Sequence, residues 1–238
     1  MTLLSILGLG FVLGMRHATD SDHVVAVSTI VSRERSAWAA TLIGALWGVG
    51  HTFTIMAVGG AIIVFDLIIP ARLGLSMELS VGVMLVVLGA LNLSGAWRRI
   101  EQVAHAHEHH DGRAAHRAHA DRAPALGLIW LARPLLVGVV HGLAGSAAVA
   151  LLVLTTIRSV HTALLYLAVF GLGTVVGMAV LTTAFAAPLA FAAAKSDRIN
   201  HYMARATGAL SLAFGMLVLY KIGIVDGLFT SHPHWTPQ

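Results

Sequence analysis

The sequence lacks cysteine and is poor in charge, and both shortages limit what the protein can be. Without cysteine it can form neither disulfides nor thiolate metal sites. Charged residues make up 11% and hydrophobic residues 57% of the 238 residues, whereas about 25% of a soluble domain is charged. The composition therefore predicts an integral membrane protein.

The few basic residues do not indicate nucleic-acid binding, because they lie between apolar segments, where they report orientation in a bilayer. We expect the lipid bilayer as a partner and no nucleic acid. The apolar run at 3–15 has no basic segment before it and no small-residue cleavage site after it. We interpret it as a retained membrane span and not as a signal peptide.

Six apolar stretches are long enough to cross a hydrocarbon core, which takes about 20 residues. The fold class predicted is an all-α membrane protein with six transmembrane helices. The stretches cover residues 3–31, 38–69, 75–97, 126–157, 162–194 and 203–228.

Lysine and arginine set the expected orientation. With the amino terminus outside, the inner loops hold eleven of these residues and the outer segments three, namely Arg72, Arg158 and Lys221. This positive-inside bias predicts a cytoplasmic (inner) membrane protein with both termini outside. The polar connection at 98–125 then lies in the cytoplasm. The oligomeric state stays open.

The two halves of the chain resemble each other. The matched stretches are "GMRH" at 14–17 with "GVVH" at 138–141, "ALWGVGHT" at 45–52 with "AVFGLGTV" at 168–175, and Gly82 and Gly89 with Gly208 and Gly215. Because three spans per unit is an odd number, the second copy must be inverted. The prediction is a 3+3 inverted repeat, 1–97 and 126–238, with a transport site near the midplane.

"RHATDSDH" at 16–23 places charge inside the first predicted span. A charged residue at a helix centre costs about 2.5–3.5 kcal/mol, so such residues usually face a cavity or a partner and mark a transport path. Arg16 could pair with the aspartates and only fix the packing, but that leaves two histidines unexplained. We therefore favour a metal path.

The local geometry leaves two ligand sets open. A regular helix, at about 100° per residue, puts His17, Asp20 and His23 on one stripe. A local unwinding lets His17, Asp22 and His23 converge, and broken helices commonly build transporter sites. Imidazole and carboxylate ligands suit Ni²⁺, Co²⁺ or Zn²⁺ and do not favour soft Cu(I).

Three polar residues in other spans can complete such a site: His51, Asn92 and His141. Each could instead be a hydrogen-bonded packing residue, but together with the first span they can supply a further ligand or a partner behind the ligands. The predicted metal residues are His17, Asp20, Asp22, His23, His51, Asn92 and His141.

At this point the sequence resembles the nickel/cobalt transporter family. "RHATDSDH" fits that family's H-x4-D-H signature, whose usual form is close to RHAxDADHI, and "GHTFTIM" at 50–56 resembles its histidine-containing next helix. The resemblance implies uptake of Ni²⁺ or Co²⁺, with His17, Asp22, His23 and His51 on the metal path. It covers the first three spans. In the fourth span the longer members carry a "DTATE"-like motif and this chain has "HGLAGSAA", so it resembles the short, urease-accessory type of nickel permease.

The predicted function is a permease that takes up Ni²⁺ or Co²⁺ as substrate through a midplane His/Asp site, without enzyme activity and without a cofactor. Ligation needs neutral histidine and ionised aspartate, so binding should fail below about pH 6, near the reference pKa of histidine. Alternatives are export of the same ions and a membrane metal sensor or metallo-enzyme that does not move the ion. A non-metal carrier with Asp20 or Asp22 as a proton relay leaves the histidines unexplained.

Two polar segments are expected to be less important. "HAHEHHDGRAAHRAHA" at 105–120 holds six histidines, a composition typical of weak divalent-metal binding. We expect this loop to be disordered and transport to survive its deletion. The terminal "SHPHWTPQ" is expected to be an outer tail with no decisive role.

Overall fold

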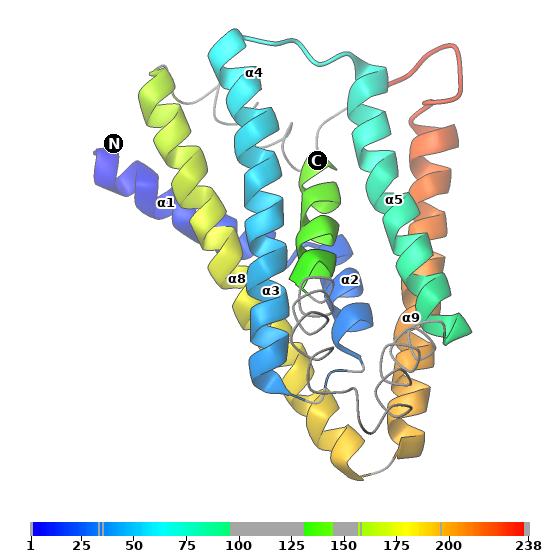
Figure 1. Cartoon of the computed structure of the whole chain (residues 1–238). Coiled ribbons are helices and arrows are strands. Elements are labelled where there is room, and N and C mark those ends of the chain that lie inside the picture. Colours follow the sequence, from blue (N-terminus) through cyan, green and yellow to red (C-terminus); the bar gives the residue numbers. More distant parts are fainter. Residues whose placement is uncertain are drawn as a thin grey trace, which may run out of the picture.

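The computed structural model describes residues 2–32, 34, 36–95, 131–144, 157, 159–195 and 197–235, with side chains omitted for 189–200. Within these ranges the chain forms helices and no strand. The long helices run side by side, as Figure 1 shows. The all-helical prediction is therefore confirmed for this part of the chain.

Four helical stretches are long and apolar enough to cross a membrane: Ala37–Phe65, Ala71–Ser94, Val160–Pro188 and His201–Val225. The first joins α3 (Ala37–Thr54), the π-helical η1 (Ile55–Gly59) and α4 (Gly60–Phe65). The others belong to α5 (Ala71–Ser94), to α8 (Val160–Lys195) and to α9 (Asp197–Tyr220) with the π-helical η2 (Lys221–Val225). Such stretches are typical of a multi-pass membrane protein.

The first predicted span is broken into two helices, α1 (Leu3–His17) and α2 (Ser21–Val31). The Thr19 hydroxyl and backbone N–H both donate to the Arg16 carbonyl, at 2.6 and 2.8 Å, and close a turn. Asp20 is the extended N-cap residue of α2. In Figure 1, α1 runs obliquely across the bundle and α2 follows a different direction. The unwinding that the sequence left open is present.

The helices pack closely because glycine faces backbone at their crossings. α8 packs against α1 and α3, and α5 packs against α9. A Cβ atom on Gly14 would overlap the Phe170 carbonyl of α8, so α1 needs glycine there. A second such crossing joins α3 to an apolar helix, Leu131–Ala144, which we call the 131–144 helix. These crossings fix α1 against α8 and the 131–144 helix against α3.

Parts of the predicted topology lie outside the described residues. The histidine loop at 98–125 is one, and of the span predicted at 126–157 the helix Leu131–Ala144 and Ile157 alone are described. The count of six spans and the inverted repeat therefore stay predictions.

Candidate metal site

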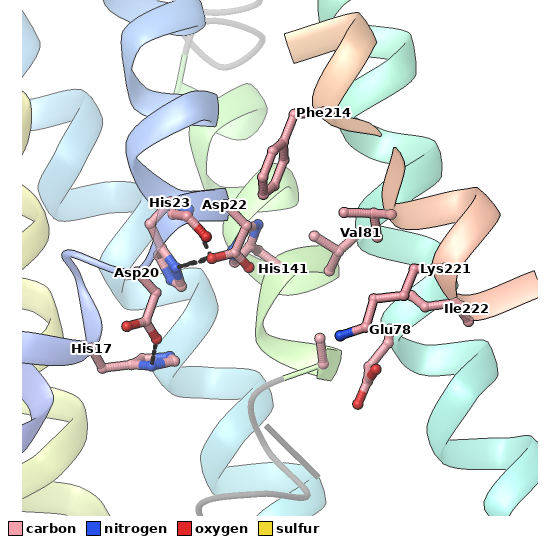
Figure 2. Close-up of a pocket in the computed structure, with 13 residues that line it drawn as sticks. His17, Asp20, Asp22, His23, Glu78, Val81, His141, Phe214, Lys221 and Ile222 are labelled. Carbon is pink, nitrogen blue, oxygen red and sulfur yellow. Dashed lines mark hydrogen bonds and ion pairs between the residues drawn. The ribbon is translucent and has the colours of Figure 1, made fainter. Parts of the chain in front are cut away.

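A cavity of about 390 Å³ opens beside the break in the first span. One wall carries the imidazole and carboxylate side chains of the break, and the other is formed by α5, α9 and η2, as Figure 2 shows. Histidines and carboxylates predicted from the sequence to bind metal line it, namely His17, Asp20, Asp22, His23 and His141. The break therefore presents metal-binding atoms to a space large enough for a hydrated ion.

The break itself places these side chains. His17 lies in the last turn of α1, where the helix dipole favours a cation. Asp22 lies in the first turn of α2, where the dipole favours a carboxylate. His23 follows it and is buried. The unwound turn thus directs α1 and α2 toward one region from opposite sides.

Three histidines form the first of two donor groups, the histidine group, made of His17, His23 and His51. His51 comes from α3 and is fully buried. Its Nε2 atom lies 3.1 Å from Nε2 of His17. Two nitrogens that each lie about 2.0–2.1 Å from one ion are separated by about 3.0–3.4 Å, so this pair has the spacing of two ligands of one ion.

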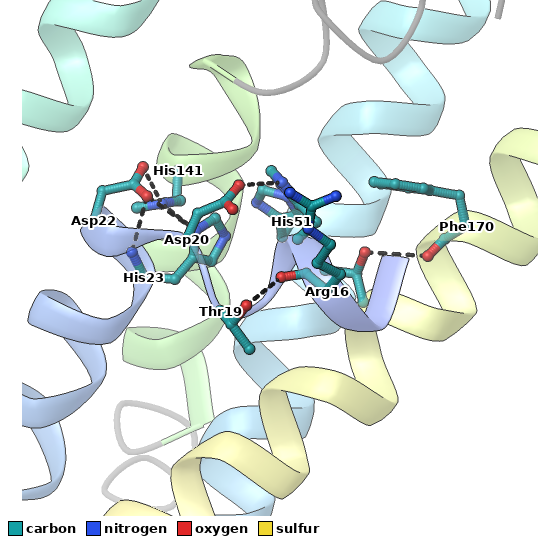
Figure 3. Close-up of polar contacts among 10 residues, drawn as sticks. Arg16, Thr19, Asp20, Asp22, His23, His51, His141 and Phe170 are labelled. Carbon is teal, nitrogen blue, oxygen red and sulfur yellow. Dashed lines mark hydrogen bonds and ion pairs between the residues drawn. The ribbon is translucent and has the colours of Figure 1, made fainter. Parts of the chain in front are cut away.

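The second group, the aspartate group, consists of Asp22, His23 and His141. Asp22 Oδ2 lies 3.0 Å from His141 Nε2, and Asp22 Oδ1 lies 3.2 Å from His23 Nδ1. The two histidine nitrogens are themselves 3.2 Å apart. Figure 3 shows these side chains converging from α2 and the 131–144 helix. Nitrogen and carboxylate oxygen donors meet here at ligand spacing.

His23 belongs to both groups. Its Nδ1 atom faces Asp22 and His141. Its Nε2 atom is buried and, among the described residues, has no hydrogen-bond partner. That nitrogen is therefore available to the histidine group, where the donor atoms lie within 4.8 Å of one another. One imidazole can serve two neighbouring ion positions.

Asp20 has a different place from Asp22. Its Oδ2 atom lies 2.7 Å from Nδ1 of His17, and its side chain is 52% exposed. A carboxylate on this nitrogen fixes the imidazole orientation and keeps Nε2 free for an ion, as carboxylates commonly do behind histidine ligands. Both aspartates pair with histidines, and this disfavours the alternative in which they only neutralise Arg16.

Asn92 lies away from both groups. Its amide donates to the Ala204 carbonyl at 2.8 Å and to Ser32 Oγ at 3.3 Å. It thus joins α5 to α9 and to the end of α2. The structure brings together the other six predicted residues and leaves Asn92 in a packing contact.

Two charged residues of the cavity were missed by the sequence reasoning. Glu78 of α5 and Lys221 of η2 line the wall opposite the histidines (Figure 2). Glu78 is the single acidic residue in 71–94, and that isolation within an apolar span was the available signal. Lys221 was counted only toward the orientation.

No protein-family model matches the chain, and no solved structure matches it. The chain is similar to the urease accessory protein UreH of Bacillus sp. (strain TB-90). The two are 39% identical over 229 residues, which cover 95% of this chain and 96% of the relative. Similarity over almost the whole of both chains, together with the four apolar helices, identifies a multi-pass membrane protein. The chain belongs to the family of the urease accessory protein UreH.

Proposed function

We propose that this protein is a permease that carries Ni²⁺, or Co²⁺, into the cell through the two donor groups. The observation that carries the proposal is the convergence of four histidines and Asp22 beside a cavity, with donor atoms 3.0–3.2 Å apart. Imidazole and carboxylate without thiolate suit these ions. The similarity to a urease accessory protein agrees with the resemblance of "RHATDSDH" to the urease-accessory type of nickel permease.

The groups suggest an order of binding. Of the two donor groups, the aspartate group is proposed to bind an ion from the cavity first, because Asp22, His23 and His141 all line it and the Asp22 side chain is 29% exposed. His51 is fully buried and is not among the described residues that line the cavity. An ion that moves to the histidine group leaves Nδ1 of His23 and binds Nε2 of the same ring, so His23 supplies one ligand atom at each position.

Helix contacts support an inverted repeat as the frame of this path. Gly14 approaches Phe170, and the sequence matches these two with Gly138 and Trp47. Gly138 in turn approaches the Trp47 carbonyl. An exchange of each residue for its match thus converts one observed crossing into the other, which is what a two-fold relation between halves requires.

Two more crossings behave in the same way. The repeat matches Gly48 with Gly171 and Val175 with Thr52. Gly48 contacts Val175, and Gly171 contacts Thr52, whose hydroxyl donates to the Gly171 carbonyl at 3.0 Å. The contact of Gly89 with Gly208 has as its counterpart the contact of Gly215 with Gly82. The proposed frame is therefore three spans per half, with the ion path where the halves meet.

The proposed orientation has both termini outside and the loop at 98–125 in the cytoplasm. It rests on the eleven basic residues that this arrangement places inside. The cavity then faces outward, because Lys221 and the chain after it lie in an outer segment. The proposed direction of transport is import, because "RHATDSDH" resembles the signature of the nickel/cobalt uptake family.

The test is accumulation of radiolabelled nickel in cells that express the full chain, compared with His17→Ala and Asp22→Ala. Both variants should lose accumulation, and the matched control His161→Ala, which removes an exposed histidine at the start of α8, should not. Cells that import should become nickel-sensitive, whereas nickel tolerance would mean export. Unchanged accumulation in His17→Ala and Asp22→Ala would overturn the proposal.

A further inference from the structure

The wall of the cavity that faces the donor groups carries two opposite charges. Glu78 lies in the second turn of α5, and Lys221 begins η2 at the end of α9. Figure 2 shows both residues on the wall opposite Asp22 and His141, with the Lys221 amine pointing toward them and the Glu78 carboxylate below it. Neither residue belongs to the donor groups. Charge within a membrane helix is expensive, so a half-buried Glu78 calls for a role.

The end of the chain holds Glu78 in place. Trp235 donates its indole Nε1–H to Glu78 Oε1 at 2.8 Å. The same indole covers Gly74, one turn earlier on α5, where a Cβ atom would overlap the ring. The His234 N–H donates to the Asp226 carbonyl at 2.9 Å and folds the tail back toward α5. The tail was expected to have no decisive role, yet it contacts the one carboxylate of this wall.

The local backbone is consistent with a functional role for Lys221. It begins a π-helical segment, and such segments occur frequently at functional sites. Its ammonium group repels a divalent cation in the same space where Glu78 attracts it. On this wall, the attraction for a metal ion therefore depends on the balance of these two side chains, while Asp20 and Asp22 add negative charge on the opposite wall.

We propose that Glu78 is the carboxylate that first receives the divalent cation in the cavity, that Trp235 positions it, and that Lys221 opposes it. This inference rests on the proposed function and extends it to the capture of the ion. A carboxylate in the cavity raises the local concentration of a divalent cation and its rate of association, and the ammonium group of Lys221 reduces this effect. The capture step therefore contributes to the apparent affinity for the ion, in addition to the donor groups that ligate it.

The test is the concentration dependence of radiolabelled nickel uptake by the full chain in proteoliposomes. Glu78→Gln keeps an oxygen that can accept from Trp235 and removes only the charge. We expect KM to rise about tenfold, at the low end of reported focusing effects, with Vmax unchanged. Lys221→Gln should lower KM. The matched control is Asp66→Asn, which neutralises an exposed carboxylate at the end of α4 and suits its φ of 50°.

A positioning role for Trp235 has its own readout. Trp235→Phe keeps an aromatic ring near Gly74 and removes the N–H donor to Glu78. It should raise KM less than Glu78→Gln does, and the double variant should match Glu78→Gln alone, because Trp235 acts through that carboxylate.

The dependence of KM on ionic strength should also weaken in Glu78→Gln.

The outcomes separate this inference from the proposed function. If the unaltered protein takes up no nickel, the proposed function fails. If it does and Glu78→Gln keeps the same KM, or loses Vmax instead, the capture role is wrong. Additive effects of Trp235→Phe and Glu78→Gln would show that Trp235 does not act through Glu78, which would overturn its positioning role.

Discussion

Replacement of Asp20 and of Asp22 by asparagine should separate a positioning carboxylate from a metal ligand. The two residues are close in sequence and lie on opposite sides of the donor groups, Asp20 behind His17 and Asp22 against His23 and His141. Asparagine is nearly isosteric, and the Asp20 side chain makes no capping hydrogen bond to α2, so Asp20→Asn keeps the start of that helix. Both variants should fold.

The expected loss for Asp20→Asn is small. Replacement of a partner behind a metal-bound histidine costs about 10–100-fold in metal affinity. The value should lie near tenfold here, because the Asp20 side chain is 52% exposed and solvent screens its charge. The asparagine oxygen can also still accept from His17 Nδ1–H and hold the ring.

The expected loss for Asp22→Asn is larger. A four-ligand zinc site contributes about 10–16 kcal/mol, which is about 3 kcal/mol for each ligand. Removal of one ligand should then raise the Kd by more than about a hundredfold. Calorimetric titration of the purified protein with Ni²⁺ measures both constants. Equal losses in the two variants, or a larger loss for Asp20→Asn, would refute the assignment of roles.

Three further outcomes are expected. Gly138→Ala should lower the melting temperature, because its Cβ would overlap the Trp47 carbonyl and overpacking costs about 1–3 kcal/mol; Gly8→Ala, with open space around it, should not change it. Uptake should decline below about pH 6, since protonated imidazole cannot bind metal, and uptake that increases steadily as the pH falls from 7 to 4 would contradict histidine ligation. Deletion of 98–125 should reduce weak metal binding and leave the uptake rate near its original value, as flux assays can show.

The sequence could predict the helices and most of the site, because both depend on local patterns. Apolar length predicted the helical stretches, and the charge of "RHATDSDH" in an apolar run marked the candidate site but left open whether the helix breaks there. The sequence could not, however, decide whether Asp20 or Asp22 binds the metal. That choice depends on the turn at 18–20, whose backbone directs the two carboxylates to different histidines.

Other parts of the site depend on contacts between distant segments. Asn92 was grouped with the histidines because all were polar residues in spans, but its amide reaches Ala204 and Ser32. Glu78 and Trp235 lie far apart in sequence, and their hydrogen bond follows from the fold of the tail onto α5. No periodicity along the chain reports such a pairing.

Transfer of the ion from the aspartate group to His51 is the central claim, and nickel flux into liposomes tests it most directly. His51 is fully buried behind the cavity, so His51→Ala should still bind an ion at Asp22, His23 and His141. We expect saturable accumulation by the unaltered protein and binding without accumulation by His51→Ala. Equal accumulation by both proteins, or binding without accumulation by the unaltered protein, would contradict it.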